Sequence, residues 1–360
     1  MNSLFKKTTG IALVLFLLIG SLSGCTELLS QWEAALLGNP TAPTEAPTVP
    51  PCAECSFGQW TQVTAPTVNT KGQDKRTCPT CGNFETRTTL ISGMDGKIMV
   101  SSPLPADYFK DKTIACIGDS ITYGYGLGNR ANSYVHVMGD ILDARIINLG
   151  VNSTGYCESG AVSHMKQNAN LTAEKIKDAD IITIALGVND WDWAVKDGIY
   201  RNKQKFDAGI DLYGLGDPSS TDPTTFYGAL RSWCEKIAEL KKLPGYENKQ
   251  FIFITPIITS WNASITTSTN WDQSKKNIHG HILRDYCEAI MDVAAEYGHL
   301  VFDANTFSGL YYNSADDNNV VKDQLEGDGV HISKEGHAIY GQSLAEFLLN
   351  GYTYEDRSAN

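Results

Sequence analysis

From residue 105 onward, short apolar runs alternate with longer segments in which apolar residues recur at helical spacing. The apolar runs predict five strands, at residues 112–118, 144–150, 180–187, 250–257 and 299–304. The other segments predict helices at 133–143, 173–179, 226–243 and 275–297, and a last helix that begins after Ser333. Ser333 is a typical N-cap residue, with Lys334 and Glu335 following in the first helical turn.

Continuously apolar strands that alternate with helices are typical of a parallel sheet covered on both faces. The pattern therefore predicts an α/β fold for residues 105–352: a three-layer α/β/α sandwich with a five-stranded parallel sheet of flavodoxin type. In such sheets, functional groups gather at the carboxyl ends of the strands.

Residues 1–25 have the pattern of a secretory signal. Lys6 and Lys7 precede the apolar run "IALVLFLLIG", and small residues follow in "LSGC". The ending resembles a bacterial lipoprotein signal, in which Cys25 would carry the lipid and begin the mature chain. The alternatives are a plain signal with an incidental cysteine and a membrane anchor, although the run is short for a helix of about 20 residues. We expect a lipid-anchored protein on the extracellular face of a bacterial membrane.

Residues 26–51 connect this signal to the folded part. Residues 26–38 can form a short amphipathic helix, and residues 39–51 are rich in proline and threonine. Such a composition predicts an extended spacer.

Residues 52–90 carry two C-x2-C pairs, Cys52 with Cys55 and Cys78 with Cys81, between short strand-like runs. Four thiolates at this spacing are typical of a zinc ribbon, and a segment this short needs such a cross-link. Two disulfides are the alternative, because an extracellular location permits them. In either case we expect a small structural module next to the α/β domain, without an open coordination position for substrate.

The formal net charge of the chain is −12. Nucleic-acid binding requires clustered Lys and Arg, so nucleic acid is excluded as a partner.

Polar residues follow three of the predicted strands. Ser120 comes after the first strand, Asn189 after the third, and the pair Asp328 and His331 after the fifth. Acyl transfer needs this set, because a serine nucleophile requires a histidine base, and that imidazole requires a carboxylate to orient it. The Asn189 amide and the Ser120 N–H are candidate donors to the oxyanion.

With these motifs, residues 105–350 resemble an SGNH or GDSL hydrolase. "GDSIT" resembles the nucleophile block, "GVND" the oxyanion-asparagine block and "DGVH" the Asp–His block, in the order of that family. The resemblance implies that Ser120 is the nucleophile, His331 the base, Asp328 its orienting partner and Asn189 an oxyanion donor. It implies no cofactor for catalysis.

The second block departs from the family pattern. That block usually reads N-x-x-x-x-G, and the glycine N–H lies in the oxyanion hole. Counting from Asn148 reaches Ser153, whose N–H can still serve, and Gly150 and Gly155 are the alternatives.

These features predict a surface-tethered serine esterase that hydrolyses small acyl esters, such as acetyl esters, on carbohydrate. The alternatives are a lipase or lysophospholipase, and a non-catalytic glycan-binding lipoprotein. Trp191 and Trp193 follow Asn189 closely and are candidates for a substrate wall or for loop packing. His337 falls one turn inside the last helix, and we expect it to be structural.

Overall fold

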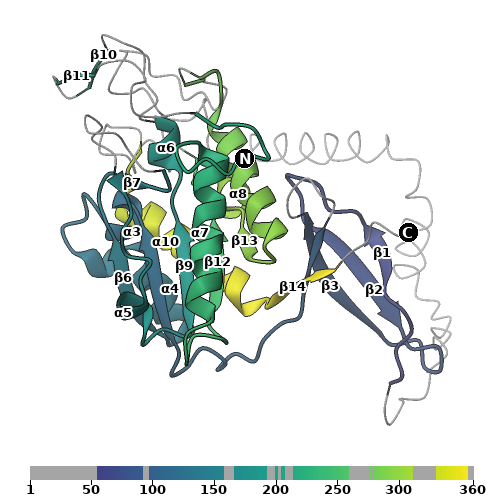
Figure 1. Ribbon diagram of the computed structural model, residues 1–360. Coiled ribbons are helices and arrows are strands. Elements are labelled where there is room, and N and C mark those ends of the chain that lie inside the picture. The colour runs from purple at the N-terminus through teal and green to yellow at the C-terminus, as the bar shows by residue number, and fades with distance from the viewer. Residues whose placement is uncertain are drawn as a thin grey trace, which may run out of the picture. The chain divides into compact units, whose positions relative to one another are not determined.

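The computed structural model describes residues 55–91, 97–157, 166–192, 199–201, 204–206, 214–258, 276–277, 279–310 and 330–355 (Figure 1). The predicted signal, short helix and spacer therefore lie outside the described residues, as does Cys52. The described chain divides into two compact units. Residues 55 and 56 with Cys78–Asn83 belong to one, and Phe57–Thr77 with the chain from Phe84 onward belongs to the other.

The predicted parallel sheet is confirmed. Its five strands lie in the order β13-β12-β9-β5-β6, with all neighbours parallel (Figure 1). The strands are β5 (Thr113–Gly118), β6 (Arg145–Gly150), β9 (Ile181–Ala185), β12 (Gln250–Ile254) and β13 (Leu300–Phe302). This is the flavodoxin-like order, in which β5 and β9 lie at the switch point of the winding.

Helices cover both faces of this sheet. The longer ones are α4 (Tyr134–Leu142), α7 (Phe226–Lys241), α8 (Leu283–Glu296) and α10 (Lys334–Leu349). Successive residues of β5 point to opposite sides: Ala115 and Ile117 pack with α7 and α8, while Ile114 and Cys116 pack with α4 and α10. Because both faces are buried, the strands have the continuous apolar pattern seen in the sequence.

The start of α8 differs from the prediction, which placed it at residue 275. Leu283 is its first residue, because the Asn277 side chain accepts the N–H groups of His279 and His281 and forms a turn instead. Asp285 then accepts the N–H of Ile282 and so satisfies a donor at the helix start. The last helix begins as predicted, with Ser333 accepting the N–H of Gly336.

A second sheet is antiparallel and has the order β1-β2-β3-β4-β14. Its strands are β1 (Thr61–Thr64), β2 (Gly72–Thr77), β3 (Phe84–Ile91), β4 (Ile98–Ser101) and β14 (Tyr352–Glu355). The sheet therefore continues past the boundary predicted at residue 90 and includes the C-terminal strand. Arg87 connects its strands through ion pairs with Asp74 and Glu355.

The antiparallel sheet also contacts the parallel-sheet domain. The Tyr354 hydroxyl donates to the His299 carbonyl at 2.5 Å, and Lys97 Nζ donates to the Ala295 carbonyl at 3.0 Å. These contacts come from β14 and from the residue before β4.

The remaining described elements are short. The helices are α3 (Ser120–Tyr123), the 3-10 turn η1 (Arg130–Asn132), α5 (Ala173–Ile176), α6 (Val188–Asp192) and α9 (Ala304–Phe307). The strands are β7 (Thr154–Gly155), β8 (Lys166–Gln167), β10 (Ile199–Arg201) and β11 (Gln204–Phe206). Among the described residues, no helix has the length and apolar character needed to cross a membrane.

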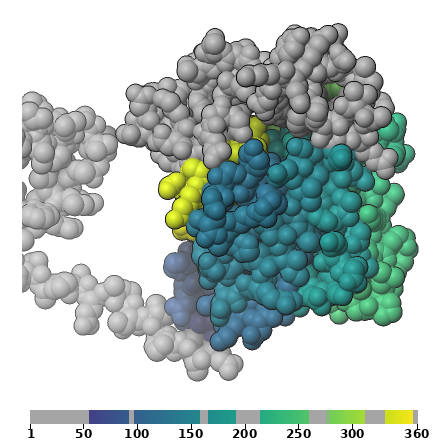
Figure 2. Space-filling view, turned by 90° about the vertical axis from the view of Figure 1, so that its left-hand side faces the viewer, coloured from purple at the N-terminus to yellow at the C-terminus, as the bar shows by residue number. Residues whose placement is uncertain are grey.

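Figure 2 shows one side of the molecule as a space-filling view. Blue to teal residues, from the first half of the parallel-sheet domain, form this surface. Yellow C-terminal residues lie on one side of it and green residues on the other.

Candidate active site

Ser120 is the first residue of α3, directly after β5. Asp119 caps this helix, since its Oδ1 accepts the Ile121 N–H at 2.9 Å. Gly124 ends the helix in the left-handed conformation, with φ 82°. A side chain at Gly118 would place Cβ 2.0 Å from Thr122 Oγ1, so the close approach of α3 to β5 requires glycine there. The sequence thus folds into a sharp turn that presents the serine at the strand end.

The structure brings His331 to this serine. His331 Nε2 lies 2.7 Å from Ser120 Oγ, although 211 positions separate the two residues. With the tautomer that leaves Nε2 unprotonated, Nε2 accepts the hydroxyl proton, as a general base must. Asp328, predicted to orient the imidazole, lies outside the described residues.

Tyr125 flanks the histidine. Its ring centroid lies 4.4 Å from that of His331, with an interplanar angle of 39°, and its side chain is half exposed. Its backbone N–H donates to the Ser120 carbonyl. Tyr125 therefore holds the imidazole from one side and offers an exposed aromatic surface beside it.

Asn189 and Asp190 bind the loop that follows β6. Asn189 Nδ2 donates to the Thr154 carbonyl at 2.9 Å. The Asp190 carboxylate accepts the N–H groups of Tyr156, at 3.1 Å, and Cys157, at 2.9 Å. The two adjacent side chains thus hold four consecutive residues, Thr154 to Cys157, in place.

Gly155 is part of this arrangement. A Cβ at that position would lie 2.4 Å from Asp190 Oδ2, so only glycine lets the carboxylate reach the backbone. Burial raises the pKa of Asp190, and the two N–H donors oppose that rise. We call Asn189, Asp190 and the backbone of residues 154–157 the loop clamp.

Ser153 immediately precedes the loop clamp and has a φ of +56°. This left-handed conformation favours glycine, which is the residue that the family pattern has at this position. The Gly150 N–H donates to the Asn148 side chain at 3.0 Å, so it is already engaged. The Ser153 N–H therefore stays the predicted oxyanion donor, with the Gly155 N–H as the alternative.

Asn168 connects the two halves of the site. Its side chain is buried and donates to the Gly118 carbonyl at 2.8 Å and to Thr154 Oγ1 at 3.2 Å. It therefore joins the backbone before the nucleophile to the loop clamp.

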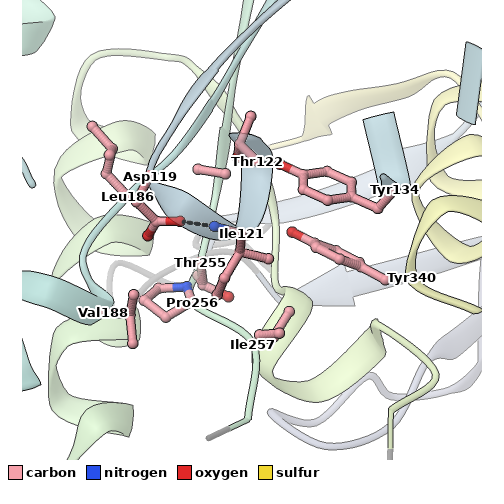
Figure 3. A pocket seen from close by; sticks show the side chains of 11 residues that line it. Asp119, Ile121, Thr122, Tyr134, Leu186, Val188, Thr255, Pro256, Ile257 and Tyr340 are labelled. Carbon is pink, nitrogen blue, oxygen red and sulfur yellow. Dashed lines mark hydrogen bonds between the residues drawn. The ribbon is translucent and has the colours of Figure 1, made fainter. Parts of the chain in front are cut away.

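A small pocket lies beside α3, and Figure 3 shows the side chains that line it. Its volume of about 20 Å³ fits one water molecule, which is too small for an acyl group. Asp119, Thr122, Tyr134 and Tyr340 are among the lining residues. Burial raises the pKa of Asp119 to about 7, although the Ile121 N–H and the nearby His331 oppose the rise.

Two other residues from the sequence analysis are structural. His337 is buried, and its Nδ1 accepts the Tyr134 N–H at 3.1 Å. Burial lowers its pKa to about 4, so the ring is neutral at pH 7. Trp191 lies in the core and donates to the His281 carbonyl, while Trp193 lies outside the described residues.

Sequence reasoning missed Tyr125, Asp190 and Asn168. Asp190 could have been found, because it completes the "GVND" block and follows a predicted strand. Tyr125 and Asn168 carry no local signal, since their importance comes from residues distant in the chain that they contact.

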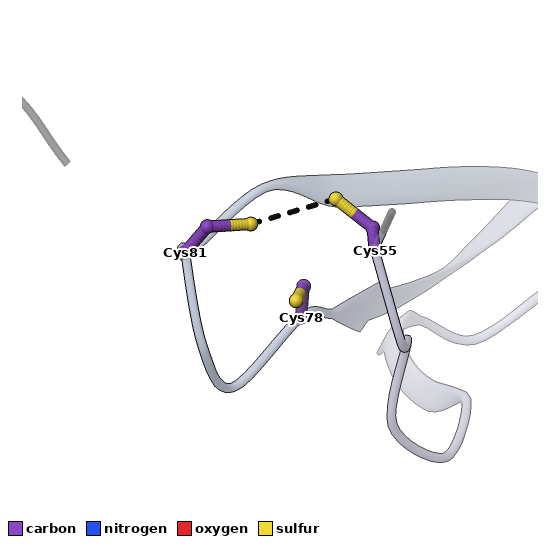
Figure 4. A group of neighbouring side chains, drawn as sticks. All are labelled: Cys55, Cys78 and Cys81. Atoms are coloured by element: carbon purple, nitrogen blue, oxygen red, sulfur yellow. Dashed lines mark hydrogen bonds between the residues drawn. The ribbon is translucent and has the colours of Figure 1, made fainter. Parts of the chain in front are cut away.

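Three cysteines of the N-terminal pattern also lie together (Figure 4). The Sγ atoms of Cys55, Cys78 and Cys81 are all within 4.8 Å of one another. The other described cysteines are buried and form no disulfide: Cys116, Cys157, Cys234 and Cys287.

Known proteins were compared with this chain by sequence and by structure. No curated protein matches its sequence. A structure of a Lactobacillus plantarum protein has 24% identity and a TM-score of 0.47, covering 66% of this chain and 97% of the other. A carbohydrate esterase family 2 enzyme with a carbohydrate-binding domain, from Myceliophthora fergusii, has 18% identity and a TM-score of 0.40, covering 74% and 70%. A variant of an acetyl-xylooligosaccharide esterase from Geobacillus has 19% identity and a TM-score of 0.39, covering 67% and 95%.

Residues 116–339 match the model of the GDSL-like Lipase/Acylhydrolase family. The match spans more than half of the chain and contains Ser120, Asn189 and His331. The protein therefore belongs to the GDSL-like lipase/acylhydrolase family of hydrolases.

Proposed function

We propose that this protein is a carboxylic ester hydrolase in which Ser120 is the nucleophile and His331 the general base. The observation that carries the proposal is the 2.7 Å distance between His331 Nε2 and Ser120 Oγ. A serine hydroxyl attacks an ester at a useful rate only when a base accepts its proton, and this distance permits that transfer.

The reaction proceeds through an acyl-enzyme. Ser120 Oγ attacks the carbonyl carbon while His331 takes the proton, and the carbonyl oxygen becomes an oxyanion. Asn189 Nδ2 and the N–H groups of Ser120 and Ser153 stabilise this charge. His331 then protonates the leaving alcohol, and a water molecule that His331 deprotonates hydrolyses the acyl-enzyme. Asp328 accepts the other imidazole N–H and fixes the tautomer.

The surroundings of the nucleophile support a small acyl group. Ser120 is 6% exposed and Asn189 is 7% exposed, so both residues are largely covered. The half-exposed ring of Tyr125 beside His331 gives the alcohol part of the ester a flat apolar surface. We propose small esters such as acetyl esters on carbohydrate as substrates, with a long-chain lipid ester as the alternative.

The N-terminal sequence supports tethering. The basic start, the short apolar run and "LSGC" favour a lipid on Cys25, and the proline-rich residues 39–51 favour a spacer. We propose that the enzyme is held at the extracellular face of a bacterial membrane.

Ester hydrolysis by the purified protein tests this function. We expect turnover of p-nitrophenyl acetate, slower turnover of a long-chain p-nitrophenyl ester, and labelling of Ser120 by a fluorophosphonate. Ser120→Ala and His331→Ala should each remove most of the turnover, and the double variant should lose little more, because the two residues act as a unit. His337→Gln serves as the control for removal of a histidine outside the reacting atoms.

The outcomes separate the alternatives. Full ester hydrolysis by Ser120→Ala would overturn the assignment of the nucleophile. Faster turnover of the long-chain ester would favour the lipase. A folded wild-type protein that neither hydrolyses esters nor reacts with the fluorophosphonate would favour the non-catalytic glycan-binding protein.

A further inference from the structure

We propose that Cys55, Cys78 and Cys81 hold a structural zinc ion, in a site separate from the hydrolase chemistry. The function proposed above uses none of these residues. Two observations support the inference: the distances between the sulfur atoms and the backbone turn that carries the thiols.

The first reason is geometric. Zinc bound by four thiolates at about 2.3 Å in a tetrahedron places neighbouring sulfur atoms about 3.8 Å apart. The three Sγ atoms lie within 4.8 Å of one another, and those of Cys55 and Cys81 are 3.5 Å apart. Three corners of a tetrahedral site are therefore present, and small side-chain rotations bring each sulfur to its ideal distance.

The second reason is the backbone that carries the thiols. Cys78 and Cys81 belong to one tight turn, in which the Gly82 N–H donates to the Cys78 carbonyl and the Cys78 N–H donates to the Asn83 carbonyl. Gly82 has a φ of +74°, so the turn uses glycine where a left-handed residue is required. Asn83 Nδ2 lies 3.5 Å from Cys55 Sγ and donates to it, as a residue around a thiolate ligand does.

Disulfides explain this arrangement less well. A disulfide joins two sulfur atoms at about 2.05 Å, whereas all three described thiols are free and gather around one point. Cys78 and Cys81 are buried, and one cation stabilises several buried thiolates at once. The sequence predicts Cys52 as the fourth ligand, since it forms a C-x2-C pair with Cys55. Cys52 lies outside the described residues.

The site is structural because four protein ligands would leave no open position for water or substrate. The thiols release their protons when zinc binds, so each bond replaces S–H by S–Zn without any change of oxidation state. The ion would fix the turn between β2 and β3 to the segment that precedes β1. Such a cross-link matters where the surrounding apolar core is small.

Metal analysis of the full-length protein tests the inference. We expect about one zinc per chain, and its loss should lower the thermal unfolding temperature of the metal-bound part while ester turnover stays unchanged. Cys78→Ser should lose the zinc. Thr80→Ala is the matched control, because Thr80 is exposed in the same turn and offers no sulfur.

Alkylation and mass mapping complete the test. If zinc is bound, all four thiols should become alkylated after the metal is chelated under denaturing, non-reducing conditions. If these four cysteines instead form two disulfides, mass mapping would find them unmodified until the protein is reduced, and that result would overturn the proposal. Stoichiometric iron in place of zinc, or a Cys78→Ser variant that keeps its full zinc content, would overturn it as well.

Discussion

Replacement of Asp190 by asparagine isolates the contribution of the loop clamp to catalysis. The carboxylate accepts the N–H groups of Tyr156 and Cys157, three and four residues after Ser153. Asparagine has the same shape and keeps one acceptor oxygen, but it loses the negative charge. The loop that carries the Ser153 N–H should then be held less firmly.

The size of the effect follows from these hydrogen bonds. A hydrogen bond to a charged group contributes about 1.5–3 kcal/mol, against about 0.5–1.5 kcal/mol for a neutral pair. Two such bonds therefore lose roughly 2 kcal/mol together. If the whole loss falls on the oriented oxyanion donors, kcat decreases by about 30-fold, at 1.36 kcal/mol for each factor of ten. This is an upper limit, because burial raises the pKa of Asp190 and so disfavours its charged form in the wild-type protein.

Steady-state kinetics with p-nitrophenyl acetate measures this effect. Because the oxyanion exists in the transition state, kcat should decrease while KM changes little. Gly155→Ala should act in the same direction, since its Cβ would lie 2.4 Å from Asp190 Oδ2. Asp180→Asn is the control: Asp180 Oδ2 accepts the Thr113 N–H at 2.8 Å at the amino end of the strands, away from Ser120.

Two results would refute this reasoning. The first is a kcat for Asp190→Asn within twofold of the wild-type value. The second is a loss of activity that disappears when kcat is expressed per active site titrated with fluorophosphonate. That result would mean that the substitution only reduces the fraction of folded protein, which is the effect expected if Asp190 has a structural role alone.

Four further outcomes are expected. Asn189→Ala should lower kcat by roughly 10²–10³-fold with little change in KM, because it removes an oxyanion donor; an unchanged kcat would contradict that role. Ser153→Gly should keep its activity and its stability, because the N–H remains and glycine adopts φ +56° without strain; a large loss of kcat would show that the side chain acts. The Asp119 pKa rises from 3.8 to about 7 on folding, so the folded state binds the proton more tightly, and stability is lost as pH rises from about 4 to 7. Urea unfolding should show wild type losing up to about 4 kcal/mol across that range relative to Asp119→Asn, which does not titrate there, and equal slopes would contradict it. Cys25→Ser should release the protein from membranes or leave unprocessed precursor, as fractionation and mass spectrometry would show, and a mature wild-type chain that begins elsewhere would contradict the lipid anchor.

The sequence by itself determined the fold class and the positions of the strands along the chain. Continuous apolar runs occur where strands are buried on both faces, so β5, β6, β9, β12 and β13 could all be located. Helix ends with a strong side-chain cap were also predictable, as at Ser333. The start of α8 was not, because the Asn277 turn that delays it depends on hydrogen bonds to residues two and four positions away.

The candidate site was predictable only as a set of residue types at one edge of the sheet. Parallel strands place their carboxyl ends together, so the predicted fold already brought Ser120, Asn189 and His331 near one another. The sequence could not decide their distances or the partners that hold them. Those depend on side chains that meet only after folding.

Tertiary structure alone decided the details of the loop after β6. It engaged the Gly150 N–H with Asn148, placed Ser153 in a left-handed conformation and brought Asp190 against Gly155. It also added β4 and β14 to the strands of the N-terminal pattern, since their pairing joins residues as far apart in the chain as Ile98 and Glu355. Local sequence patterns report burial and turns, but contacts between distant residues form only when the packed chain satisfies its buried polar groups.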